Sequence, residues 1–323
     1  MPFVYIRAEG QAGRMGVQLM AIVAEGPNGR VYLPPVEEHV GVTKSTKPKW
    51  WPSAHLEGKV AVNVPLYGIE TFGDLFTPRQ LTGLTTFSDL VQEVREEALK
   101  DALATGLAED GKGLAEGGRG AAAYADAVAT YLAFAVDRLA DRSSSICTWD
   151  VGYTKIRNTF ARQAIPMSWD YAESNPFSNS TGNFTSATNW IHSVISNSPI
   201  AAYGWAKQVN ATESINGVQQ PVLSTDPPYY DNICYADLSD FFYIWLRRNL
   251  GNLYPELFTT ILVPKDEELV ATPYRFEGDK EKAREFFETG LGQAFAGMRA
   301  SQNPKYPLTV YYAFKQAELE VSD

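Results

Sequence analysis

The stretch that decides the expected fold lies in the last third of the chain and reads Val222-Leu223-Ser224-Thr225-Asp226-Pro227-Pro228-Tyr229. An apolar run that is typical of a strand ends abruptly in an acid, two prolines and an aromatic ring. An open parallel sheet binds its ligands outside the carboxyl ends of its strands. We therefore expect the tetrapeptide Asp226 to Tyr229 to lie at a ligand-binding edge.

The elements after this turn predict a parallel sheet. Residues 238–246 place apolar side chains at helical spacing, and residues 280–298 continue as a second helix. Residues 308–314 then form another apolar run that is typical of a strand. A strand, a loop, two helices and a strand in this order indicate a parallel α/β sheet.

The sequence pattern before the turn is first typical of strands and then typical of helices. Short apolar runs at 3–6, 17–23 and 31–33 are separated by glycines and predict a β-rich start. Thr77, Pro78 and Gln80 are the residues of a helix start with a capping box. A second periodic run follows Thr86, and residues 121–139 form a strongly apolar helix that we expect in the core, with a stripe that includes Tyr124.

These patterns divide the chain into three expected domains. They are a β-rich segment over residues 1–75, a helical region over 76–145 and an α/β region over 146–323. The glycine-rich residues 111–120 are expected to be a flexible connection, since they contain no Gly-Lys-Ser/Thr of a phosphate loop. A short helix is expected near residues 186–195.

Composition excludes several classes of protein. With 28 Lys and Arg against 38 Asp and Glu, the formal net charge is −10, so general electrostatics would not hold the chain on nucleic acid. Two cysteines without a CxxC pair exclude a disulfide scaffold and a cysteine-rich zinc site. No apolar run is long enough for a membrane span, and no signal pattern opens the sequence, so we expect a cytoplasmic protein with no metal.

Two local clusters are candidates for contacts with DNA. Lys47, Lys49, Trp50 and Trp51 place cations beside aromatic rings, a combination that grips phosphates and stacks on bases. The alternative, which we favour from the sequence, is an exposed loop whose tryptophans pack on the domain. From Cys147 onward aromatic residues and asparagines become frequent, and cations such as Arg157 add local positive charge.

The chemistry of the tetrapeptide fits methylation of an amine. The exocyclic amine of adenine is a poor nucleophile, because its lone pair is delocalised into the ring. The carboxylate of Asp226 and the backbone carbonyl of Pro227 are suited to accept hydrogen bonds from its two N–H groups, while Pro227 and Pro228 stiffen the turn. Tyr229 is suited to stack on a base that has left the duplex.

Long stretches of the chain resemble a family of prokaryotic adenine-specific DNA methylases that carry a zinc ribbon. The principal match runs from Ser224 through Asp226-Pro227-Pro228-Tyr229-Tyr230-Asp231-Asn232-Ile233 to Trp245-Leu246-Arg247-Arg248. Further matches, in family order, are Ala12-Gly13-Arg14-Met15-Gly16, residues 75–81, residues 86–90 and residues 167–177. The resemblance therefore covers nearly the whole chain.

The resemblance implies a fold, a cofactor and a partner. The fold would be α/β: a partial Rossmann-like methyltransferase sheet with a helical insertion and a small β-rich N-terminal segment. The cofactor would be S-adenosylmethionine and the partner DNA, within a restriction-modification or phage-defence system. Trp169, Asp170, Glu173 and Asn175 would line the pocket, or alternatively only fix a loop.

The chain departs from the family in ways that leave two functions open. The family's glycine-rich donor loop, of the type Asp-Pro-Phe-x-Gly-x-Gly, and its zinc-ribbon cysteines lie upstream of the region that matches and are absent here. The chain looks like the family's C-terminal portion, with residues 146–323 expected to be the C-terminal half of its methyltransferase catalytic domain. It is expected to be a methyltransferase fragment that carries the catalytic turn, or a non-enzymatic DNA- or protein-binding subunit that needs a partner chain with the donor-binding half.

Overall fold

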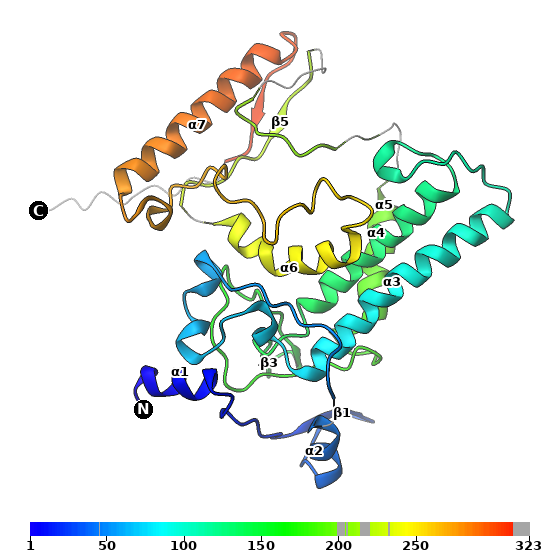
Figure 1. The fold of residues 1–323 in the computed structure, drawn as a ribbon, viewed down its shortest axis with the longest axis vertical. Coiled ribbons are helices and arrows are strands. Elements are labelled where there is room, and N and C mark those ends of the chain that lie inside the picture. Colours follow the sequence, from blue (N-terminus) through cyan, green and yellow to red (C-terminus); the bar gives the residue numbers. More distant parts are fainter. Residues whose placement is uncertain (45, 199–203, 205, 214–219, 232, 313–323) are drawn as a thin grey trace, which may run out of the picture. The chain divides into compact units, whose positions relative to one another are not determined.

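The computed structural model describes residues 1–44, 46–198, 204, 206–213, 220–231 and 233–312 (Figure 1). The chain forms two compact units. Unit 1 comprises Met1–Pro199 and Leu238–Val263, and unit 2 comprises Ile200–Asp237 and Pro264–Asp323. The predicted division into three consecutive domains stays a prediction. In the part of the chain that is described, no helix is long and apolar enough to cross a membrane.

The predicted α/β class is wrong. The structure is mostly helical, with 45% helix and 7% strand, and the described residues form three two-stranded sheets and no Rossmann-like sheet. Among the described residues, the parallel pair joins β5 (Ser224–Thr225) to β6 (Thr309–Val310). Both strands are shorter than predicted, since apolar strands were expected from residue 222 to the turn and over 308–314, of which residues 313 and 314 lie outside the described residues. Pro227 has no amide hydrogen with which to continue the ladder, so β5 ends where the prolines begin.

The N-terminal segment is also not β-rich. Residues 3–6 belong to helix α1, and Phe3 packs edge-on against Tyr67 at 5.6 Å between ring centres. The predicted strand over 31–33 lies within a hairpin, while only the end of the 17–23 run enters a strand. The elements up to residue 76 are α1 (Phe3–Gln11), β1 (Ile22–Gly26), β2 (Gly29–Leu33), α2 (Glu37–Lys44) and the 3₁₀ helices Gly58–Ala61, Val64–Tyr67 and Phe72–Leu75.

The helical region follows its predicted start closely. Helix α3 (Pro78–Ala104) begins with the predicted capping box between Thr77 and Gln80. It continues through Thr86 without the predicted second start, and the Thr86 hydroxyl donates to the Thr82 carbonyl one turn earlier, at 2.7 Å. The remaining elements of unit 1 are the 3₁₀ helix Leu114–Glu116, α4 (Ala121–Ala140), β3 (Trp149–Asp150), β4 (Lys155–Ile156), α5 (Phe184–Asn197) and most of α6 (Tyr235–Leu250).

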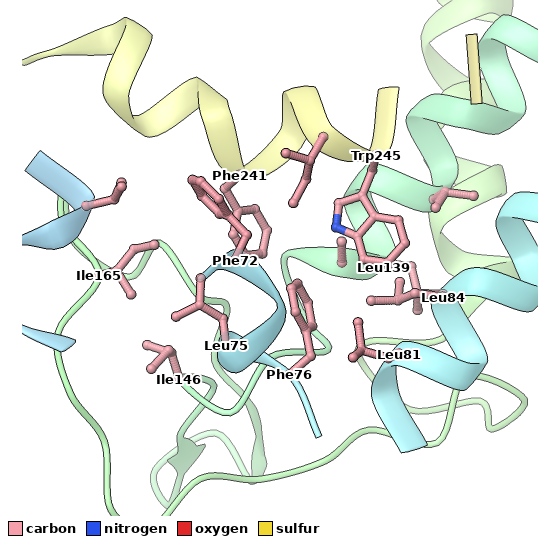
Figure 2. Close-up of a cluster of buried hydrophobic side chains, with 14 of the residues drawn as sticks. Phe72, Leu75, Phe76, Leu81, Leu84, Leu139, Ile146, Ile165, Phe241 and Trp245 are labelled. Atoms are coloured by element: carbon pink, nitrogen blue, oxygen red, sulfur yellow. The ribbon is translucent and has the colours of Figure 1, made fainter. Parts of the chain in front are cut away.

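The core of unit 1 gathers side chains from segments far apart in the sequence (Figure 2). Phe76 stacks on Phe241 of α6 at 5.6 Å and meets Trp245 edge-on at 5.7 Å. Leu81 and Leu84 of α3 pack into the same cluster. Each such side chain contributes about 1.5–3 kcal/mol by leaving water. The α4 stripe predicted to be core is only partly so: α4 buries its alanines, whereas Tyr124 and Tyr131 are exposed.

Unit 2 has less regular structure. It consists of the β5–β6 pair, the N-terminal end of α6, the 3₁₀ helix Pro273–Phe276 and α7 (Lys280–Ser301). Asp279 caps α7 by accepting hydrogen bonds from the amides of Glu281 and Lys282. The candidate turn Asp226 to Tyr229 lies in this unit, directly after β5.

Candidate functional site

The turn after β5 presents one exposed carboxylate. The amide of Tyr311 donates to the carbonyl of Thr225 at 2.8 Å, and this is the last bond of the ladder. Asp226 follows and is exposed, whereas Pro227 is buried and Pro228 is half-buried. Among the described residues, no hydrogen bond reaches the carbonyl of Pro227. The two oxygen acceptors predicted from the sequence therefore have capacity for another donor.

Tyr229 hydrogen-bonds to that carboxylate. Its hydroxyl donates to Oδ1 of Asp226 at 2.9 Å. This hydrogen bond raises the pKa of Tyr229 above its ordinary value, since ionising the phenol would remove the donor beside a carboxylate. The ring of Tyr229 stands edge-on to Tyr312, with 5.5 Å between ring centres. A base that reached Asp226 would meet the Tyr229 hydroxyl first.

Tyr230 directly follows the turn and has a strained backbone conformation that the sequence did not predict. Its φ is 26°, a value that residues with a side chain rarely adopt. Two contacts hold it there: its carbonyl accepts from the amide of Ala271 at 2.9 Å, and its ring meets Phe287 edge-on at 5.2 Å. Both partners are distant in sequence, so no local sequence pattern could predict this conformation of Tyr230.

A buried ionic network, which we call the Asp237 clamp, fixes the segment that follows the turn. Asp237 is fully buried and accepts hydrogen bonds from the hydroxyl of Tyr274 and from Nη2 of Arg275, the latter at 3.0 Å. Arg275 also donates to Glu268 at 2.7 Å, and Glu268 accepts from the amide of Ala236 at 2.9 Å. Burial and the hydrogen bond to Asp237 raise the pKa of Tyr274. The clamp thus ties residues 264–276 to the start of α6.

A cleft in unit 2 lies along α7 and does not include the turn. Its volume is about 340 Å³. Its lining residues are Asn210, Thr212, Asp266, Glu267, Leu269, Glu285, Phe286, Thr289, Gly290 and Gln293. None of the residues from Asp226 to Tyr229 is among them, so this cleft does not join the acceptors of the turn to a ligand pocket.

The predicted pocket residues Trp169, Asp170, Glu173 and Asn175 belong to unit 1, so they are described apart from the turn. Trp169 is exposed and meets Tyr67 edge-on at 5.7 Å. Glu173 pairs with Arg79, whose Nε lies 2.9 Å from its carboxylate, and Asn175 accepts from the amide of Phe177 at 3.0 Å. Glu173 and Asn175 thus make contacts that fix a loop, while their role in a pocket stays a prediction.

Most of the residues proposed to contact DNA make contacts within unit 1. Trp50 contacts Trp245, at 5.2 Å between ring centres, and the guanidinium of Arg248, which lies 4.7 Å from its ring centre. Trp51 lies against Gly73, where a side chain would collide with its indole. Arg157 pairs with Asp150 at 2.9 Å. Lys47 and Lys49 are exposed. The contacts of the two tryptophans match the packed loop that the sequence favoured, and DNA contact stays a prediction.

The glycine-rich residues 111–120 connect α3 to α4 and do not follow a strand. Binding of S-adenosylmethionine stays a prediction. Within the described ranges, no group of three or more His, Cys, Asp or Glu side chains is placed to hold a metal ion. Cys147 and Cys234 are buried free thiols, and burial raises the pKa of Cys147, which favours its neutral form.

Comparisons with known proteins do not assign the chain. No family model, no curated protein and no solved structure matches it. The resemblance to adenine-specific DNA methylases therefore stays a prediction, which depends on the sequence and on the geometry of the turn.

Proposed function

We propose that the chain supplies the acceptor side of an S-adenosylmethionine-dependent methyltransferase that acts on the exocyclic amine of adenine in DNA, and that a partner chain supplies the donor side. One observation carries the proposal: the exposed carboxylate of Asp226 stands at the end of β5, on a turn that two prolines stiffen. A fixed acceptor is what the reaction needs from this side of the site.

The two acceptors of the turn would act on the amine directly. One N–H of adenine donates to the carboxylate of Asp226 and the other to the carbonyl of Pro227. These hydrogen bonds draw the nitrogen toward tetrahedral geometry and make its lone pair available for attack. The hydroxyl of Tyr229, now 2.9 Å from Asp226, swings away as the amine arrives. The base must leave the duplex first, since the amine is otherwise engaged in base pairing.

The residues around the turn favour a role in which they hold the acceptors of the turn in place. Tyr230 holds an unusual backbone conformation, and the Asp237 clamp fixes the segment just beyond it. Strained residues that their surroundings hold in place concentrate at functional sites. The donor side is assigned to a partner because the sequence lacks the glycine-rich donor loop of the family that it resembles.

A second function, a non-enzymatic DNA- or protein-binding subunit, is favoured by a different observation. The carboxylate of Asp226 already has a donor in Tyr229, and the cleft of unit 2 does not include the turn. In this alternative, the turn is a structural remnant, and no methyl transfer takes place at it when the partner chain binds.

Methyl transfer separates the two functions. The assay measures tritium transfer from S-adenosylmethionine to adenine in DNA by the chain together with a co-encoded protein that carries the glycine-rich loop. We expect transfer by the pair and none by either protein alone. Asp226→Ala should lower the rate at least about 100-fold, as loss of a preorganised electrostatic contact does.

The matched control is Asp231→Ala, which removes another exposed acid five residues further on. This variant should retain the rate. An unchanged rate in Asp226→Ala would refute the mechanism. If the pair binds DNA but transfers no methyl group, the binding-subunit function replaces it.

A further inference from the structure

The cleft along α7 is separate from the acceptor turn and has a lining of its own. Its volume of about 340 Å³ is in the range of pockets that bind small molecules. Two loop segments of unit 2, which contribute Asn210 with Thr212 and residues 266–269, face one side of α7. Because the turn does not line the cleft, binding of a ligand there does not depend on the proposed methyl transfer.

The α7 wall gives the cleft an elongated shape. Glu285, Thr289 and Gln293 line it at spacings of four residues, which places them on one face of the helix. The eight residues from the first to the last cover about 12 Å along the helix axis. Leu269 packs so closely on Gly290 that a side chain there would collide with it. The cleft therefore suits a long ligand.

Part of the lining is apolar. Leu269 and Phe286 line the cleft and are half-buried, so each still exposes apolar surface. Phe286 is held in place by Phe276, at 5.3 Å between ring centres. Apolar groups gain free energy when they leave water, so these two side chains favour a ligand with methylene groups.

The charged part of the lining attracts cations. Asp266, Glu267 and Glu285 are exposed carboxylates, and the residues that line the cleft include no Lys, Arg or His. In the part of the chain that the structure describes, no ion pair joins any of the three to a cation. Their charge is therefore available to a positively charged ligand, and an anion such as a phosphate would be repelled.

The spread of these carboxylates distinguishes between kinds of cation. Over the described ranges, no three acidic, His or Cys side chains are placed to hold one metal ion. A ligand that neutralises all three must therefore carry positive charges at separate points. A linear polyamine does so, since methylene chains separate its ammonium groups and alkyl amines have pKa values near 10.

We propose that the cleft along α7 binds a linear aliphatic polyamine. The methylene chains pack on Leu269 and Phe286, and the ammonium groups lie beside the carboxylates of Asp266, Glu267 and Glu285. The amide and hydroxyl oxygens of the lining accept the remaining N–H donors. The net charge of −10 attracts any polycation to the chain, whereas the shape of the cleft selects the linear one.

Isothermal titration calorimetry of the full chain with spermidine tests the proposal. We expect saturable binding that weakens with added NaCl, since salt screens exposed charges. Glu285→Gln should raise the dissociation constant at least about fivefold, because it removes a charge-assisted hydrogen bond, and Asp266→Asn combined with Glu267→Gln should raise it further. The matched control is Glu288→Gln, at an exposed residue of α7 outside the cleft, and it should bind spermidine like the original chain.

Two further ligands separate binding in the cleft from general attraction. Hexaamminecobalt(III) has the charge of spermidine in a compact ion without methylene groups, so it should bind at least about tenfold more weakly. Equal affinity for the two ions, or an unchanged affinity of Glu285→Gln for spermidine, would overturn the proposal. Tighter binding of a peptide of three lysines would also overturn it and assign the cleft to a basic protein segment. Absence of saturable binding at about 1 mM spermidine would exclude a polyamine site.

Discussion

Unit 1 and unit 2 are stabilised by different interactions. Unit 1 encloses a contiguous apolar core, in which Phe72, Phe241 and Trp245 are fully buried. In unit 2 the strand pairing is a two-residue parallel ladder, and the buried charge of Asp237 is matched by Arg275. The candidate site lies in the unit whose geometry depends on charge pairing. We therefore expect the site to be sensitive to changes of charge and the scaffold to changes of volume.

The largest effect is expected in the core of unit 1. Trp245→Ala should lower the free energy of unfolding by about 3–5 kcal/mol, because it removes a fully buried ring and leaves a cavity. Urea unfolding followed by circular dichroism measures this loss. Val62→Ala, at a residue that is 58% exposed, is the control and should change the value by less than about 0.5 kcal/mol. A small loss for Trp245→Ala would show that the core does not dominate this unit.

The next effect tests the charge pairing of unit 2. Arg275→Met should destabilise this unit by about 3 kcal/mol, because it leaves the buried Asp237 without its cation. Amide hydrogen exchange of residues 264–276 reports the loss. Arg284→Met is the matched control, since Arg284 pairs with Glu281 at an exposed position, and it should cost less than about 0.5 kcal/mol. Equal losses of stability for the two substitutions would contradict the claim that the pair of Asp237 and Arg275 stabilises unit 2.

A pH effect tests whether unit 1 contains a buried carboxyl group without a partner. Burial raises the pKa of Asp137 well above its ordinary value, and its Oδ1 has no hydrogen-bond partner among the described residues. Because the folded state binds this proton more tightly than the unfolded state, stability is greatest below the unfolded pKa near 3.9 and falls as pH rises toward the folded pKa. One proton limits the slope to about 1.4 kcal/mol per pH unit.

Asp137→Asn removes this titration. The free energy of unfolding of the variant should therefore depend less on pH, and the variant should be more stable than the original chain at pH 7. Urea unfolding between pH 4 and 8 measures both quantities. A variant whose pH dependence matches that of the original chain would show that Asp137 is paired and charged in the folded state.

The smallest effect on stability is expected at the turn itself. Asp226→Asn should change the free energy of unfolding by less than about 0.5 kcal/mol, because the side chain is exposed. It should, however, lower the pKa of Tyr229 toward its ordinary value, since the hydrogen bond to a carboxylate is what raises it. Titration of ¹³C-labelled tyrosine by NMR follows this change, and Tyr229→Phe identifies the resonance. An unchanged pKa would mean that the two side chains do not interact in solution.

Local patterns predicted the helices better than the sheet. The capping box at Thr77 and the apolar period of residues 121–139 involve neighbours within one or two turns, and both helices form. The predicted sheet needed partners from distant segments, and the described residues supply one short pair. The expectation that the stripe with Tyr124 lies in the core was wrong, since α4 buries its alanines and leaves Tyr124 and Tyr131 exposed.

The candidate site was predictable only where it is contiguous. Asp226 to Tyr229 stand together in the sequence, so the pattern could single them out, and the structure places them directly after β5 with Asp226 exposed. The Asp237 clamp joins residues more than thirty positions apart, from Ala236 and Asp237 to Glu268 and Arg275, so no spacing rule points to it. The strain at Tyr230 likewise depends on Ala271 and Phe287.

The central claim is that the carboxylate of Asp226 receives the exocyclic amine of adenine. The most direct test compares binding of two single-stranded oligothymidylates, one with a central deoxyadenosine and one with purine deoxyriboside, which lacks only the amine. Fluorescence anisotropy should show at least about tenfold tighter binding of the adenine strand, as expected for a hydrogen bond to a charged group, and Asp226→Ala should abolish the difference. Equal affinity of the original chain for the two strands would contradict the claim.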